Sequence, residues 1–129
     1  MLAYVLFGIL LLHDLWRPEA AYWYAALLED GGYGRLSTER AAFLIRETDG
    51  TLTLQPWRDR AHRRASFRGS VPERTIALLH THPRHDVRPS AHDREEARRL
   101  ALPVVVITPD AVIAAMPNGN ELLITTLER

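Results

Sequence analysis

The feature that most constrains the fold is an uninterrupted run of β-branched, mostly apolar residues at positions 104–108. Successive side chains of a strand point to opposite faces of a sheet, so this run predicts a strand that is buried on both faces. A chain of 129 residues is long enough to bury such a core in one domain. Together with the helices predicted below, the run indicates a mixed α/β fold.

The segments on either side predict the remaining elements. Pro18 and Glu19 suit the first turn of a helix over residues 18–28, and a group of glycines at 31, 32 and 34 ends it. Residues 41–47 and 51–57 flank an Asp-Gly step and predict a β-hairpin. We further expect a loop or irregular helix at 58–69, strands at 75–82, 104–108, 111–116 and 121–127, and a helix from Ser90 to about residue 100.

The first twelve residues are almost wholly apolar. They are too few for a bilayer-spanning helix, which needs about 20 apolar residues. They also lack the basic leader and the nearby cleavage site of a signal peptide. We expect residues 1–16 to add a strand or helix to a domain formed by residues 17–129. This favours a cytoplasmic location, and a membrane or export segment, with membrane contact only through residues 1–12, stays the alternative.

Composition excludes several functions. Sixteen basic residues balance sixteen acidic ones, so the chain has no overall positive field to hold nucleic acid. Cysteine is absent, which excludes disulfides and thiolate metal ligands. A metal site in this chain must therefore use histidine and carboxylate.

Two histidines and a carboxylate have the spacing of such a site. His80 and His82 are two apart on a predicted strand, so their side chains share one face. Ser90 and Asp93 have the spacing of a helix capping box, which by itself explains both residues. The loop 83–89 is nevertheless long enough to fold the helix start back over the strand end, where Asp93 would be a third ligand. This set is typical of catalytic zinc, whose fourth position holds a water of lowered pKa.

A catalytic zinc site also needs a general base close to its water. Glu29 is the first candidate, because the glycines that follow it would let the chain pass close to the metal. Glu39 and Glu47 are the alternatives.

The segment His80-Thr81-His82-Pro83 through Ser90-Ala91-His92-Asp93 resembles the motif of the JAMM or MPN-plus metalloproteases, His-x-His-x7-Ser-x2-Asp preceded by a glutamate. The resemblance implies a compact, prokaryotic-type member with a JAB/MPN-like curved sheet and two or three helices. It also implies that His80, His82 and Asp93 bind one zinc ion at a strand end and helix N-terminus. Glu29, which Gly32 follows at the family's spacing of three residues, would activate the water, and Ser90 would stabilise the oxyanion.

The resemblance further implies hydrolysis of an amide or isopeptide bond. The expected substrate is the C-terminal tail of a ubiquitin-like or sulfur-carrier protein, or a peptide. Two alternatives remain open at this point. The first is a non-catalytic binding module with the same fold. The second is an iron oxygenase with two histidines and one carboxylate, for which the predicted strands are too few to build the usual double-stranded barrel.

Overall fold

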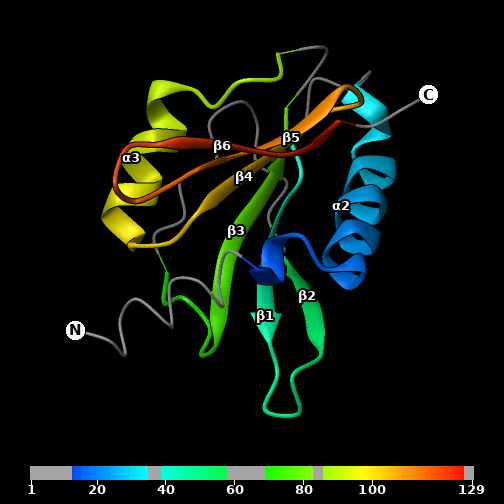
Figure 1. Ribbon diagram of the computed structural model, residues 1–129, viewed down its shortest axis with the longest axis vertical. Coiled ribbons are helices and arrows are strands. Elements are labelled where there is room, and N and C mark those ends of the chain that lie inside the picture. The colour runs from blue at the N-terminus through cyan, green and yellow to red at the C-terminus, as the bar shows by residue number, and fades with distance from the viewer. Residues whose placement is uncertain (1–12, 35–38, 58–68, 83–85, 127–129) are drawn as a thin grey trace.

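The computed structural model describes residues 13–34, 39–57, 69–82 and 86–126. Six strands form one mixed sheet in the order β2-β1-β3-β4-β5-β6 (Figure 1). Strands β3 and β4 pair in parallel, and the other neighbours pair antiparallel. The strands are β1 Ala41–Arg46, β2 Leu52–Pro56, β3 Thr75–Thr81, β4 Val104–Ile107, β5 Ala111–Ala115 and β6 Glu121–Thr126.

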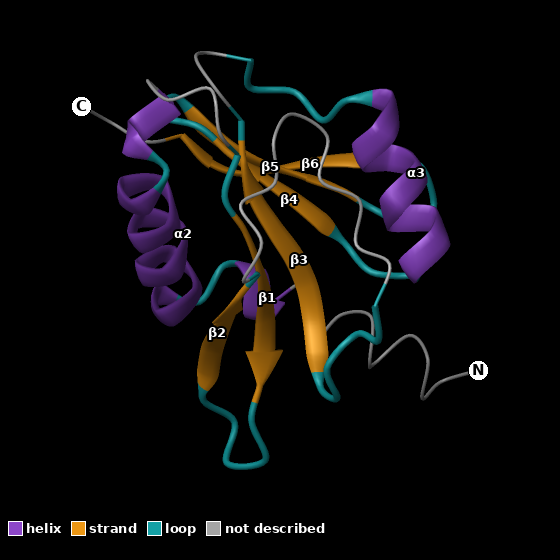
Figure 2. Ribbon diagram, turned by 180° about the vertical axis from the view of Figure 1, so that it is seen from behind, coloured by secondary structure: helices purple, strands orange, loops and turns teal. Residues whose placement is uncertain are grey.

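Two helices pack on opposite faces of this sheet (Figure 2). Helix α2 (Pro18–Asp30) covers the face that includes Leu79 and Val105. Helix α3 (Ala91–Leu100) covers the other face, where its Ala97 joins a cluster with Leu78 and Val104. All four residues of β4 are buried, as expected of a strand between two layers.

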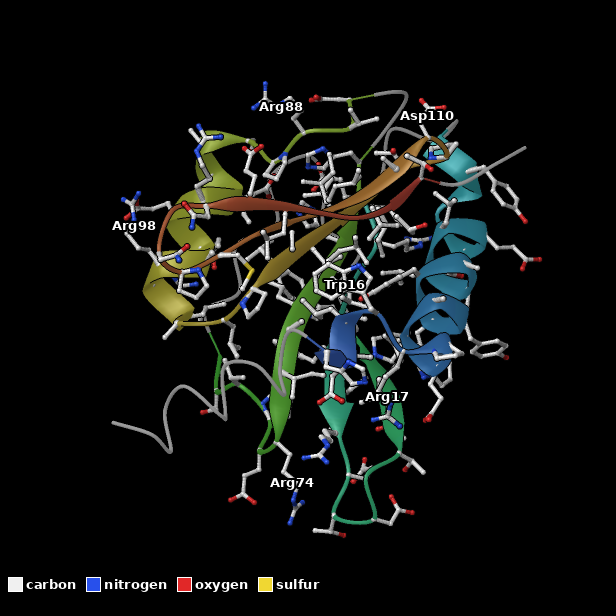
Figure 3. The ribbon with its side chains drawn as sticks, viewed as in Figure 1. Trp16, Arg17, Arg74, Arg88, Arg98 and Asp110 are labelled. Atoms are coloured by element: carbon white, nitrogen blue, oxygen red, sulfur yellow. The ribbon has the colours of Figure 1, made fainter. Side chains whose placement is uncertain are left out.

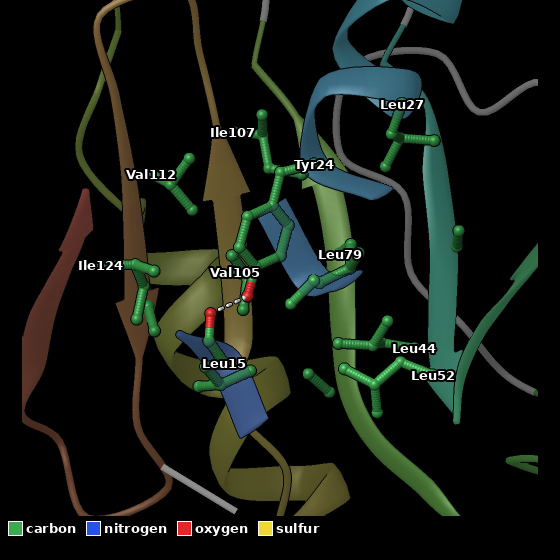
Figure 4. Packing of buried hydrophobic residues seen from close by; sticks show 14 of the residues in the cluster. Leu15, Tyr24, Leu27, Leu44, Leu52, Leu79, Val105, Ile107, Val112 and Ile124 are labelled. Atoms are coloured by element: carbon green, nitrogen blue, oxygen red, sulfur yellow. Dashed lines mark hydrogen bonds between the residues drawn. The ribbon is translucent and has the colours of Figure 1, made fainter. Parts of the chain in front are cut away.

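The core beneath α2 is the larger of the two clusters (Figure 4). Tyr24 is 2% exposed, and its hydroxyl donates a hydrogen bond to the Leu15 carbonyl at 2.8 Å. This bond satisfies a polar group that burial would otherwise leave without water. It also fastens the turn before α2 to the middle of the helix.

The predicted hairpin is confirmed. Strands β1 and β2 pair antiparallel with Phe43 opposite Gln55. Gly50 takes a φ of +88° in the turn, a conformation that favours glycine. The Asp49 carboxylate accepts hydrogen bonds from the backbone N–H and the hydroxyl of Thr51.

The other predicted elements within the described residues are also confirmed. The first helix extends two residues beyond the predicted end at 28 and is followed by a 3₁₀ turn, Gly32–Gly34. Residues 1–12 of the segment predicted at 1–16, most of the loop predicted at 58–69 and residues 83–85 of the loop before α3 lie outside the described residues. Among the helices of the described part of the chain, none has the length and apolar character to cross a membrane.

Candidate metal centre

The two histidines lie at the end of β3 on the face that α3 covers. His80 pairs with Val106 of β4, and the His82 N–H donates to the Ile107 carbonyl at 3.2 Å. Their side chains are buried, and the ring centroids are 4.8 Å apart. The alternation of β3 therefore delivers both imidazoles to one place, as predicted.

The N-terminus of α3 brings Asp93 to the histidines. Ser90 is the N-cap of the helix: its Oγ accepts the Asp93 N–H at 3.1 Å, and Asp93 Oδ2 accepts the Ser90 N–H at 2.7 Å. The capping box is therefore present. It holds the Asp93 side chain against the first turn, facing the strand end, so capping and metal binding are compatible in one residue.

Asp93 contacts both imidazoles at once. Its Oδ1 lies 2.8 Å from His80 Nε2, and its Oδ2 lies 3.1 Å from His82 Nε2. His80 Nε2 is buried and, within the described part of the chain, has no hydrogen bond of good geometry despite that short contact. The three side chains thus present two ring nitrogens and a carboxylate to a common point.

Neighbouring groups leave the Nε2 atoms free to act as metal ligands. His82 Nδ1 lies 2.8 Å from the Asp86 carbonyl oxygen, which can only accept, so Nδ1 carries the hydrogen. In a neutral imidazole this leaves the Nε2 lone pair for a metal, the arrangement common around ligating histidines. His80 Nδ1 lies 3.5 Å from Glu39 Oε2, so the Glu39 carboxylate lies close to this ring. The donor set therefore fits zinc.

The electrostatics of the site also favour a cation. Burial alone lowers the pKa of His80, but the adjacent carboxylates of Asp93 and Glu39 outweigh burial and raise this pKa to about 9. Burial raises the pKa of Asp93, yet the two histidines hold it well below its usual range. The buried carboxylates thus favour positive charge at this point. A divalent cation would supply such charge.

Glu39 is the second carboxylate, after Asp93, that the structure places beside the histidines. It is 9% exposed and precedes β1, and one ligand atom each from Glu39, His80 and His82 lie within 4.8 Å of one another. The first candidate from the sequence, Glu29, is instead exposed in the last turn of α2. Glu47 lies past the opposite end of β1, where it accepts a hydrogen bond from Thr53. The structure therefore favours Glu39, the alternative, over Glu29.

The sequence signal for Glu39 is a small residue, Ala42, three positions after it. Gly32 stands three residues after Glu29, which is the glutamate-to-glycine spacing that the resemblance implies. Ala42 stands three residues after Glu39 and is completely buried, so a small residue rather than glycine occupies that position.

Glu121 fastens the N-terminal part of α3 to β6. Its carboxylate lies 3.2 Å from the Arg88 guanidinium and 3.5 Å from that of Arg94. Arg88 extends from the loop before the helix, whereas Arg98 extends from the outer side of the helix (Figure 3). Since Arg88 and Arg94 flank Ser90 and Asp93 in the chain, these contacts link the start of α3 to β6.

The four remaining histidines are His13, His62, His85 and His92. His92 lies 3.9 Å from Glu96, one turn further along α3. Glu96 is 5% exposed and lines a cavity of about 10 Å³ with His80 and Asp93, which is room for about one water. Nothing in the sequence singled out Glu96. His13 is exposed, and His62 and His85 lie outside the described residues.

The sequence profile of the Prok-JAB family, described as prokaryotic homologs of the JAB domain, matches residues 34–123. The chain belongs to this family. The resemblance found in the sequence and the mixed α/β fold are thereby confirmed. The Prok-JAB match includes Glu39, both histidines of β3 and Asp93, but it begins after Glu29. Comparison with individually curated proteins finds no match.

Proposed function

We propose that this Prok-JAB protein is a zinc-dependent hydrolase of amide or isopeptide bonds. The observation that carries the proposal is the convergence of His80 Nε2 and His82 Nε2 on the Asp93 carboxylate, with Glu39 alongside. Membership of the JAB family supports it. The proposed substrate is the C-terminal tail of a ubiquitin-like or sulfur-carrier protein, or a peptide.

In this proposal His80, His82 and Asp93 hold the ion, and each remaining group has a defined task. A zinc ion bound there supplies Lewis acidity and makes a water nucleophilic near neutral pH. Glu39 takes a proton from the attacking water and passes it to the leaving amine. Ser90 is exposed, and because its oxygen already accepts the Asp93 N–H, its hydroxyl hydrogen is directed elsewhere and can reach the substrate oxyanion.

The test compares Glu39, the base favoured by the structure, with Glu29, the base favoured by the sequence. Glu39→Gln keeps the shape of the side chain but cannot accept a proton. We expect it to retain stoichiometric zinc by elemental analysis and to lose about 10²–10⁴-fold in kcat on ubiquitin-like fusions and lysine-linked conjugates. Glu29→Gln is the matched control and should cleave as the wild type does. A chelator should abolish turnover, and added zinc should restore it.

The other outcomes point to other functions. If Glu29→Gln abolishes turnover while Glu39→Gln does not, the base is Glu29. If freshly purified protein holds no stoichiometric metal and cleaves none of the substrates, the chain is a non-catalytic binding module. Oxygen-dependent turnover with bound iron would indicate an oxygenase, although the open sheet differs from the barrel usual in that class.

A further inference from the structure

Thr81 stands between the two proposed ligands but takes no part in binding the metal. Because side chains alternate along β3, Thr81 points to the face that α2 covers, away from His80 and His82. It is 1% exposed. A hydroxyl so deeply buried is expected to be hydrogen-bonded, and its partner indicates its role.

That partner belongs to the residue next to Glu39. Thr81 Oγ1 accepts the Arg40 N–H at 2.9 Å, and the Thr81 N–H donates to the Arg40 carbonyl at 2.9 Å. The β1 strand begins only at Ala41, which pairs with His80. These two hydrogen bonds therefore hold the backbone of Arg40, the residue just before β1. Glu39 is the residue immediately before Arg40.

We propose that Thr81 is a positioning residue for Glu39. Its hydroxyl fixes the backbone at Arg40, and this fixes where the Glu39 carboxylate lies, 3.5 Å from His80 Nδ1. The inference rests on the proposed function, in which Glu39 is the base. Thr81, which stands between His80 and His82, would hold Glu39 at a fixed distance from these two ligands.

The end of α2 holds Thr81 from the other side. A Cβ at Gly31 would lie 3.0 Å from Thr81 Oγ1 and 3.4 Å from Thr81 Cγ2. Gly31 has φ −81° and ψ 4°, which alanine adopts freely, so space rather than backbone conformation limits this position. The Asp30 carboxylate also contacts the Arg40 guanidinium at 3.1 Å. The Thr81 hydroxyl thus has little freedom to leave the Arg40 N–H.

Two substitutions at Thr81 separate positioning from simple packing. Thr81→Val keeps the branched shape but removes the acceptor, whereas Thr81→Ser keeps the acceptor. In crystal structures of the zinc-loaded variants, we expect the Glu39 carboxylate to be displaced from His80 in the valine variant and to remain in the serine variant. Amide hydrogen exchange at Arg40 should be faster only in the valine variant.

The kinetic expectation follows from the same displacement. Thr81→Val should keep its zinc and its KM while kcat falls about a hundredfold, since a misplacement near 1 Å has that effect. Thr81→Ser should retain most of the wild-type kcat. Gly31→Ala, which pushes on the hydroxyl from α2, should lower kcat in the same way and is the second variant if Thr81→Val does not fold.

The inference is overturned if Glu39 stays in place and kcat is unchanged in Thr81→Val. It is also overturned if Glu39 is displaced in Thr81→Ser, which keeps the hydroxyl that accepts the Arg40 N–H. A wild type that cleaves none of the substrates would instead refute the proposed function. In that case the position of Glu39 and the exchange rate at Arg40 still decide whether Thr81 positions this residue.

Discussion

Ser90 combines helix capping with a proposed catalytic role, and substitution can separate the two. Its Oγ accepts the Asp93 N–H, whereas the reciprocal bond to Asp93 Oδ2 comes from the Ser90 backbone. Replacing a serine N-cap by alanine costs roughly 0.5–2 kcal/mol, while replacement by glycine costs only a few tenths. The backbone bond remains in both variants. Alanine therefore removes capping and the hydroxyl, and glycine removes mainly the hydroxyl.

We expect Ser90→Ala to lower the free energy of unfolding by about 1 kcal/mol. For a domain of this size that corresponds to a decrease in Tm of roughly 4 °C. Ser90→Gly should differ from the wild type by only a few tenths of a kcal/mol in stability. If the hydroxyl stabilises the oxyanion, both variants should lose about 10²–10³-fold in kcat, because neither retains the donor.

Urea unfolding followed by far-UV circular dichroism measures the first effect, in zinc-loaded and metal-free protein. Turnover of a fusion that the wild type cleaves measures the second. Ser90→Thr keeps both the cap and the hydroxyl and serves as the control. Equal stability of the alanine and glycine variants would contradict the capping argument. Near wild-type kcat in both would refute Ser90 as an oxyanion donor.

Two further predictions concern stability. Tyr24→Phe leaves the buried Leu15 carbonyl without its donor and should cost about 1–3 kcal/mol in urea unfolding at pH 7. Burial raises the pKa of Tyr24, so wild-type stability should fall as pH rises past about 10, where unfolded tyrosine ionises, and the gap between the two proteins should narrow. Hydrogen bonds from the Leu52 N–H and Arg17 lower the pKa of Glu19. This stabilisation is present above the unfolded pKa of Glu19 and is lost as pH falls through the folded one. Thermal unfolding between pH 6 and 2.5 should therefore show a smaller acid loss for Glu19→Gln than for the wild type, and parallel losses would contradict the assignment.

Much of the fold was predictable because its signals are local. The Asp-Gly step between residues 41–47 and 51–57 predicts a hairpin, and Gly50 takes the turn conformation that favours glycine. The Pro18-Glu19 start of α2 and the Ser90 N-cap of α3 were each predicted from residues within one helical turn. The continuous apolar run of β4 likewise predicted burial on both faces. Each of these signals depends on neighbours in the chain.

Local sequence signals did not decide whether Glu29 or Glu39 lies beside the histidines. It depends on the register of β1 against β3, which sets Ala41 opposite His80 and brings Arg40 to Thr81 across 41 positions of sequence. Burial of whole strand faces determines that register, and no short motif encodes it. Glu29 matched the expected spacing to glycine, but the C-terminal end of α2 leaves it exposed.

The sequence by itself determined the chemistry of the candidate site. The alternation of a strand puts His80 and His82 on one face, and the spacing of a capping box aims Asp93 along the start of a helix. Only the tertiary structure decided which acid accompanies them and what holds that acid in place. The physical reason is that side-chain direction follows from local backbone geometry, whereas the approach of Glu39 and Thr81 requires two strands and a helix end to pack together.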